Sequence, residues 1–246
     1  MLKCQATIAL ALVATWLNHA DAAPLIAIDV GHSKANPGAT SARGRPEFEF
    51  NAELANVVYG HLQTHNIPAL AIGQEGTMLV LADRTAAANK AQASFLLSLH
   101  HDSVQPKYLK TWQWQGEPQQ YSDQFSGFSL FISRKNPHTG ISLHCASAIG
   151  AALQQRGFQA SAHHHEALAG ENKAWADQQH GVYFYDNLMV LKTATMPAVL
   201  LEADVIVNRS AELAVQQPSL RSRIAEAIMH GLQQCGQLPS TPHKTP

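Results

Sequence analysis

The stretch FLLSLHHD, residues 95–102, begins as an apolar run and ends in two histidines and an aspartate. A run this apolar predicts a strand over residues 95–99 that is buried on both faces, as central strands of parallel sheets are. Two other stretches share this design: LIAIDVGH, residues 25–32, and AVLLE, residues 198–202. Each passes from apolar side chains to an ionisable one, so three predicted strands end in chemically active residues.

Segments with helical periodicity separate these strands. In residues 51–65, Leu54, Val58 and Leu62 lie at helical spacing, and Asn51 is the expected N-terminal cap. The other predicted helices cover residues 81–92, 142–156 and 219–235, and further short strands are expected at 67–72 and 128–132. Alternating strands and helices favour an α/β domain of three layers, with a mostly parallel central sheet flanked by helices.

Two polar stretches interrupt this alternation. Residues 104–126 are rich in Gln, Trp and Pro, and residues 159–186 show no clean period. We expect both to be long surface loops, which in such a domain usually serve function. Trp112 and Trp114 in the first loop could stack on a ligand or pack within the loop.

The N-terminal residues have the pattern of an export signal. Lys3 supplies a positive charge, residues 6–17 are apolar, and Ala20-Asp21-Ala22 places small residues where a signal peptidase reads. The apolar run is too short to anchor the chain across a bilayer. We therefore expect a signal peptide at residues 1–22, one catalytic domain at 23–236 and a flexible tail at 237–246.

Composition excludes several kinds of partner. The formal net charge is -1, which gives no electrostatic basis for binding nucleic acid or an anionic membrane. No second apolar stretch approaches the length of a membrane span, so none is expected in the mature chain. Cys145 and Cys235 remain after processing; the sequence leaves open a disulfide between them or two free thiols.

The ends of the three apolar strands predict a functional site. Ligands of open α/β sheets bind beyond the carboxyl ends of the strands, so His32, His100 and Glu202 are expected to converge there. Two imidazoles and a carboxylate suit a catalytic zinc ion, which takes three protein ligands and keeps one position open. Hydrogen-bonded strand ends or a metal-free base are alternatives that this pattern leaves open.

The choice of ligands also stays open at this point. Glu47 or Glu49 could add a carboxylate, and the strand-end pattern alone does not separate His100 from His101. Asp29 could orient His32 through its second ring nitrogen or cap the turn at Gly31.

Three ordered blocks of the chain resemble the family 3 domain of N-acetylmuramoyl-L-alanine amidases. Residues 26–55 contain Gly31-His32, Pro37-Gly38 and the Glu-x-x-x-Asn pattern from Glu47 to Asn51. The second block, residues 83–103, has Arg84, Ala88-Asn89 and a strand ending in Ser-x-His at His100. The third block, residues 191–208, has Met196-Pro197, Glu202 and Asn208.

This resemblance implies an exported bacterial zinc hydrolase, periplasmic or secreted. Its zinc ligands would be His32, Glu47 and His100, its catalytic carboxylate would be Glu202, and it would cleave the amide between N-acetylmuramic acid and L-alanine in peptidoglycan. Such activity serves wall turnover, cell separation or lysis. A zinc peptidase or deacetylase acting on another wall amide, and a wall-binding module without turnover, are the alternatives.

The chain departs from the family pattern at His101-Asp102 and at Ala203-Asp204-Val205. Some exported members carry an occluding segment near the position of residues 163–171. By this resemblance Glu166 or Glu171 could reach the zinc and block it until an activator protein withdraws the segment.

Overall fold

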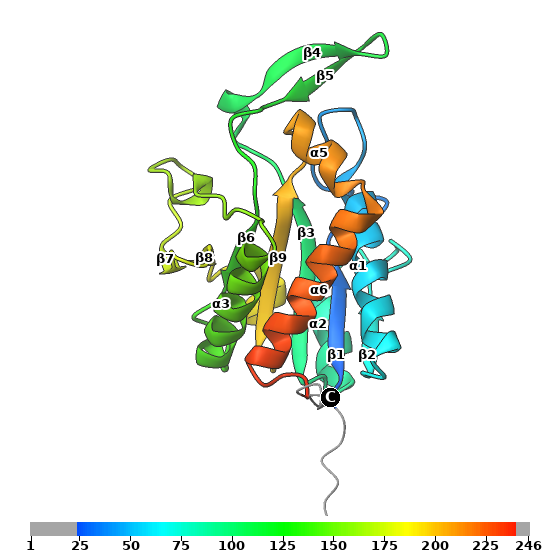
Figure 1. Cartoon of the computed structure of the whole chain (residues 1–246), viewed down its shortest axis with the longest axis vertical. Helices are drawn as coiled ribbons and strands as arrows, with labels where there is room; N and C mark the ends of the chain where they lie inside the picture. The colour runs from blue at the N-terminus through cyan, green and yellow to red at the C-terminus, as the bar shows by residue number, and fades with distance from the viewer. Residues whose placement is uncertain (1–23, 240–246) are drawn as a thin grey trace, which may run out of the picture.

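The structure, a computed structural model, describes residues 24–239. The predicted signal peptide at 1–22 and residues 240–246 of the predicted tail lie outside the described part. Seven strands form one sheet in the order β2-β1-β3-β9-β6-β8-β7 (Figure 1). Their bounds are β1 Ile26–Val30, β2 Ala69–Ile72, β3 Phe95–Asp102, β6 Ser129–Ile132, β7 Trp175–Asp177, β8 Val182–Phe184 and β9 Ala198–Val205.

Strand direction within the sheet brings the predicted site residues to one edge. β2, β1, β3 and β9 are parallel neighbours, β6 is antiparallel to β9, β8 is parallel to β6, and β7 is antiparallel to β8. Since β1, β3 and β9 are adjacent and parallel, their carboxyl ends meet. The α/β class with a mostly parallel sheet is therefore confirmed.

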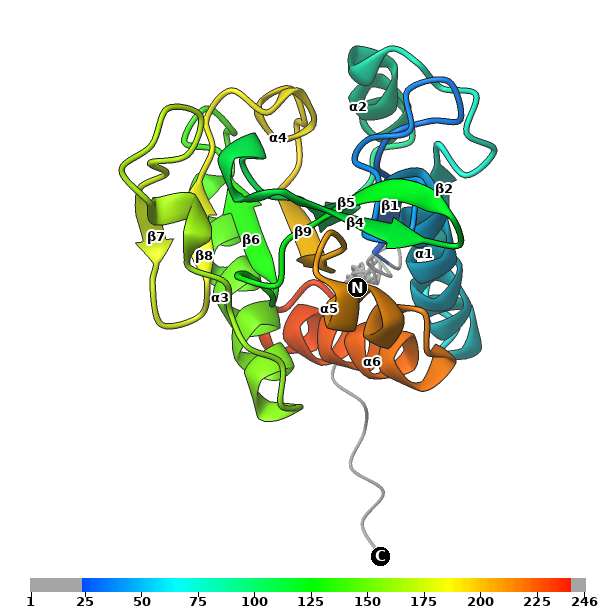
Figure 2. The same ribbon diagram turned by 90° about the horizontal axis from the view of Figure 1, so that it is seen from above.

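Helices cover both faces of the sheet. α1 (Glu47–Thr64), α3 (Thr139–Gln155) and α6 (Pro218–Gln234) pack on one face, and α2 (Leu81–Lys90) and α4 (Met189–Lys192) lie on the other (Figure 2). Leu54, Val58 and Leu62 of α1 are fully buried against the sheet. Within residues 24–239, no helix has the length and apolar character that crossing a membrane requires.

Helix α1 begins one turn earlier than the sequence predicted. Pro46 precedes it with φ -65°, and the acidic residues Glu47 and Glu49 occupy its first turn. Negative charges there interact favourably with the positive end of the helix dipole. Asn51 is therefore inside the helix and does not cap it. Its side chain instead donates to Glu47 and to the Gly31 carbonyl.

The two predicted loops contain regular structure that the sequence analysis missed. Residues 104–126 include an antiparallel hairpin of β4 (Lys110–Trp114) and β5 (Glu117–Tyr121). Gln115 and Gly116 form its turn with φ 53° and 86°, the positive values that a tight hairpin turn requires. In the second stretch, η2 (His163–His165), β7 and β8 follow one another, and β7 and β8 extend the main sheet. A further unpredicted helix, α5 (Arg209–Val215), is capped by Asn208.

A disulfide joins Cys145 in α3 to Cys235 at the end of α6, with a Cα–Cα distance of 5.0 Å. It ties together two helices that pack on the same face of the sheet. Just beyond it, Leu238 is buried, so packed structure continues into the first residues of the predicted tail.

Replacing both cysteines with alanine should lower the free energy of unfolding by about 2–5 kcal/mol, because the bridge restricts the unfolded chain across a long loop. Urea denaturation of the purified protein measures this. Reduction of the wild type should give a similar loss. An unchanged unfolding midpoint would show that the bridge does not stabilise the fold.

Candidate metal centre and active site

Three side chains from three separate elements converge at the carboxyl edge of the sheet. His32 follows β1, Glu47 begins α1, and His100 lies near the end of β3. His32 Nε2 is 3.1 Å from Glu47 Oε2, and His100 Nδ1 is 3.2 Å from Glu47 Oε1. The three potential ligand atoms lie within 4.8 Å of one another, so the structure brings the predicted ligands together.

The backbone around this cluster is compact enough to require glycine. A Cβ on Gly31 would lie 2.4 Å from the His100 ring. At Gly38, where φ is +80°, a Cβ would lie 2.4 Å from Glu47 Oε2 and 2.6 Å from His32 Cδ2. His32 itself has φ 67°, a conformation uncommon for residues other than glycine and often found at functional sites. The Gly-His and Pro-Gly pairs thus make room for the ligands.

A buried arginine holds the turn that carries His32. Arg84 donates to Asp29 Oδ1 at 2.7 Å and to the carbonyl oxygens of Val30 and His32. The second oxygen of Asp29 accepts from Ser98 Oγ at 2.7 Å. Asp29 therefore positions Arg84, and it is Arg84 that holds the turn by its hydrogen bonds to the backbone. The two roles expected for Asp29, orienting the His32 ring or capping the turn itself, are wrong.

Glu47 offers a charged carboxylate in a buried place. Its Oε2 accepts from the Ala39 amide and its Oε1 from Asn51 Nδ2, each at 3.0 Å. Burial alone would raise the pKa of Glu47, but the adjacent rings of His100 and His32 outweigh it and hold that pKa well below its usual range. An ionised carboxylate facing two imidazole nitrogens is a donor set that fits a divalent cation such as zinc.

The two alternative ligands point elsewhere. Glu49 is exposed and pairs with Arg45 at 2.7 Å on the helix surface. His101 is buried, with Nδ1 2.8 Å from Asn51 Oδ1. Burial lowers the pKa of His101 to about 3, so this ring is a neutral structural partner of α1.

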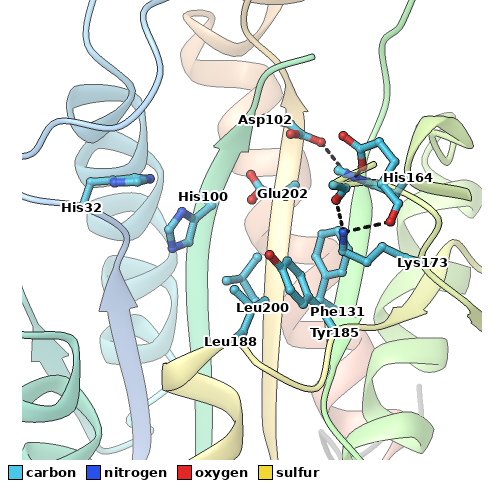
Figure 3. Close-up of a pocket in the computed structure, with 12 residues that line it drawn as sticks. His32, His100, Asp102, Phe131, His164, Lys173, Tyr185, Leu188, Leu200 and Glu202 are labelled. Atoms are coloured by element: carbon cyan, nitrogen blue, oxygen red, sulfur yellow. Dashed lines mark hydrogen bonds and ion pairs between the residues drawn. The ribbon is translucent and has the colours of Figure 1, made fainter. Parts of the chain in front are cut away.

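Glu202 lies beside the cluster at the lining of a cavity of ≈ 320 Å³ (Figure 3). It pairs in register with His100 across β3 and β9. Its Oε2 is buried and has no hydrogen-bond partner among residues 24–239. Burial, followed by the negative charges of Asp102 and Glu47, raises the pKa of Glu202 well above its usual range. An unpartnered carboxyl with a raised pKa is suited to proton transfer.

The opposite wall of the cavity contains residues that the sequence analysis did not identify as functional. Asp102 and His164 lie across Glu202 from His100 (Figure 3), and His164 Nε2 is 2.7 Å from Asp102 Oδ2. Burial would lower the pKa of His164, yet the carboxylates of Asp102 and Glu171 raise it to about 9. Asp102 ends the same strand as His100. Its place at that strand end is the feature of the sequence from which its role at the site could have been predicted.

The expected block of the zinc site by residues 163–171 does not occur in the structure. Glu171 accepts from His164 Nδ1 at 2.8 Å, and Glu166 accepts from the Tyr108 hydroxyl at 2.7 Å. Neither carboxylate belongs to the cluster of His32, Glu47 and His100. This segment lines the cavity through His164, Gly170 and Glu171, and Lys173 just after it lines the same wall.

Comparisons with known proteins identify the family and the fold of this chain. The family model for N-acetylmuramoyl-L-alanine amidase matches residues 26–234. A search of curated protein sequences found no match. Among solved structures, an N-acetylmuramoyl-L-alanine amidase from Clostridium difficile 630 is 21% identical with a TM-score of 0.65, covering 85% of this chain and 95% of that one.

Two other structures show the same fold. The amidase Ami1 from Mycobacterium smegmatis is 18% identical with a TM-score of 0.67, covering 86% of this chain and 96% of that one. The CwlD amidase from Clostridioides difficile, solved with the GerS lipoprotein, is 16% identical with a TM-score of 0.66, covering 86% and 98%.

Gly38→Ala should weaken zinc binding by about 10–100-fold, the range seen when groups that orient metal ligands are disturbed. The added methyl would displace Glu47 and His32. Isothermal titration of the metal-free protein with zinc measures the effect. Gly60→Ala is the matched control, because a Cβ there meets nothing within 4 Å. Equal affinity in both variants would show that the cluster does not bind zinc.

Proposed function

Because the chain belongs to the N-acetylmuramoyl-L-alanine amidase family, we propose that it cleaves peptidoglycan with a zinc ion held by His32, Glu47 and His100. The bond hydrolysed is the amide between N-acetylmuramic acid and L-alanine. The observation that carries the proposal is the meeting of two imidazoles and a charged carboxylate beside an unpartnered glutamate. That arrangement combines a metal donor set with a proton carrier.

Zinc bound there would polarise the scissile carbonyl and lower the pKa of the attacking water. Glu47 holds the ligand rings close together, since each of its oxygens faces one of them. The Ala39 amide and Asn51 fix its carboxylate in turn. The protein thus supplies a donor set that is already assembled before substrate arrives.

Glu202 is the proposed catalytic residue. Its free Oε2 would accept a proton from the attacking water and deliver it to the leaving nitrogen of L-alanine. Two observations support this role for Glu202: it pairs with His100 across β3 and β9, and it lines the same cavity as His32 and His100. A carboxyl whose pKa is raised above its usual range, as burial raises that of Glu202, is suited to exchange a proton with the reacting groups.

The rest of the cavity would orient the substrate. Leu188, Leu200, Phe131 and Tyr185 supply apolar lining next to Glu202 (Figure 3), which would exclude water from the reacting amide. Lys173 adds a positive charge on the same cavity, where it could pair with a carboxylate of the stem peptide.

We further propose that the enzyme works in the periplasm or outside the cell and is regulated by an activator protein. The proposal for location rests on the signal pattern in residues 1–22 and on the wall substrate of the family. The related CwlD amidase was solved in complex with the GerS lipoprotein, which supports a protein partner for this chain as well.

Glu202→Gln should reduce digestion of purified sacculi by about 100–10,000-fold while zinc content stays that of the wild type, because the amide cannot carry the proton. Release of soluble peptides, with new L-alanine amines and intact lactyl carboxylates, measures the activity and excludes a peptidase or deacetylase. Glu226→Gln, on the exposed surface of α6, is the control. Near-normal digestion by Glu202→Gln would rule out its proposed role.

Glu47→Gln should weaken zinc binding by at least about 100-fold, since losing a ligand costs no less than disturbing its outer partners. Glu49→Gln, which alters the exposed carboxylate two residues further along the same helix turn, should bind zinc as the wild type does. Zinc content after dialysis and sacculus digestion should fall together in the first variant only. Loss in both, or in neither, would contradict the ligand assignment.

A further inference from the structure

A second group of metal-ligating side chains lies on the wall of the cavity opposite His32. Asp102 ends β3, and His163 and His164 begin η2. One carboxylate oxygen and two ring nitrogens from these residues lie within 4.8 Å of one another. None of the three takes part in the proposed reaction, so the cluster requires its own explanation.

Both imidazoles point at the same oxygen. His164 Nε2 is 2.7 Å and His163 Nε2 is 3.2 Å from Asp102 Oδ2, and the two ring centroids are 4.0 Å apart. His163 is buried, and its Nε2 faces Asp102 Oδ2 without forming a well-directed hydrogen bond to it. A cation bound at this point would give that buried nitrogen a well-directed partner.

The other nitrogen of each ring is already engaged. His163 Nδ1 is 2.8 Å from Ser161 Oγ, and His164 Nδ1 is 2.8 Å from Glu171 Oε2. Metal-bound histidines usually donate their second ring N–H to such an acceptor, which fixes the tautomer and the ring orientation. A cation at this point requires the tautomer with the proton on Nδ1 in both rings, whose Nε2 lone pairs would then face the ion.

We propose that Asp102, His163 and His164 bind a second divalent cation, with zinc as the ion that best fits two imidazoles and a carboxylate. The cation would clamp η2 to the end of β3. It would thereby hold the segment that supplies Gly170, Glu171 and Lys173 to the cavity wall. The inference rests on this cluster alone and is independent of the proposed function.

The competing explanation is a metal-free ion pair. In that arrangement a protonated His164 would bridge Asp102 and Glu171, and His163 Nε2 would lie against the same Asp102 oxygen. The two explanations differ in how many zinc ions each chain retains.

The test is zinc stoichiometry after removal of metal by chelator, reloading with excess zinc and gel filtration, measured by inductively coupled plasma mass spectrometry. We expect about two ions per chain in the wild type, one for each three-ligand cluster. His32→Ala, which leaves the second cluster intact, should retain about one, and so should the near-isosteric Asp102→Asn.

His165→Ala is the matched control, because His165 belongs to the same tract but is exposed, with its Nδ1 2.9 Å from the Lys173 carbonyl oxygen and its ring against Trp175, outside the cluster. It should retain the wild-type zinc content. The proposal is overturned by no ion in His32→Ala, or by an Asp102→Asn variant that retains as many ions as the wild type. The first result does not depend on whether Asp102→Asn folds.

Discussion

Glu47 is held between the ring nitrogens of His32 and His100, and this contact is what the rest of the site depends on. It requires a carboxylate to stay charged while buried, so the protein surrounds it with the Ala39 amide, Asn51 and two imidazoles. It also requires three elements distant in sequence to end at one point. The parallel pairing of β1 with β3, and the start of α1 at Glu47, meet that requirement.

The scaffold around this contact is closely packed and held by buried hydrogen bonds. Arg84 is buried and joins Asp29 to the backbone of Val30 and His32, so its hydrogen bonds fix the turn after β1. Replacing either member of this buried pair would leave an uncompensated charge, which commonly costs about 3–5 kcal/mol. Gly31 and Gly38 allow the backbone to approach the ligands where any side chain would collide with them. Stability and site geometry therefore depend on the same few residues.

Much of this could be predicted from the sequence. The apolar runs before His32, His100 and Glu202 predicted parallel strands ending at one edge of the sheet. This prediction was possible because the carboxyl ends of parallel neighbouring strands lie at the same edge, whatever the side chains are. Periodicity could not choose between Glu47 and Glu49, because both lie in the first turn of α1 and differ only in the face they occupy. The β4–β5 hairpin escaped prediction because its strands are polar. The Asp102–His164 contact joins residues 62 apart in sequence, and no local pattern reports such a pairing.

The most direct test of the account is anomalous diffraction at the zinc absorption edge from crystals of the purified protein. The account predicts a peak enclosed by His32 Nε2, His100 Nδ1 and the Glu47 carboxylate, with Glu202 near it but outside the ligand set. Zinc-loaded crystals with no peak at this position, or with His32 and His100 turned away from Glu47, would contradict it.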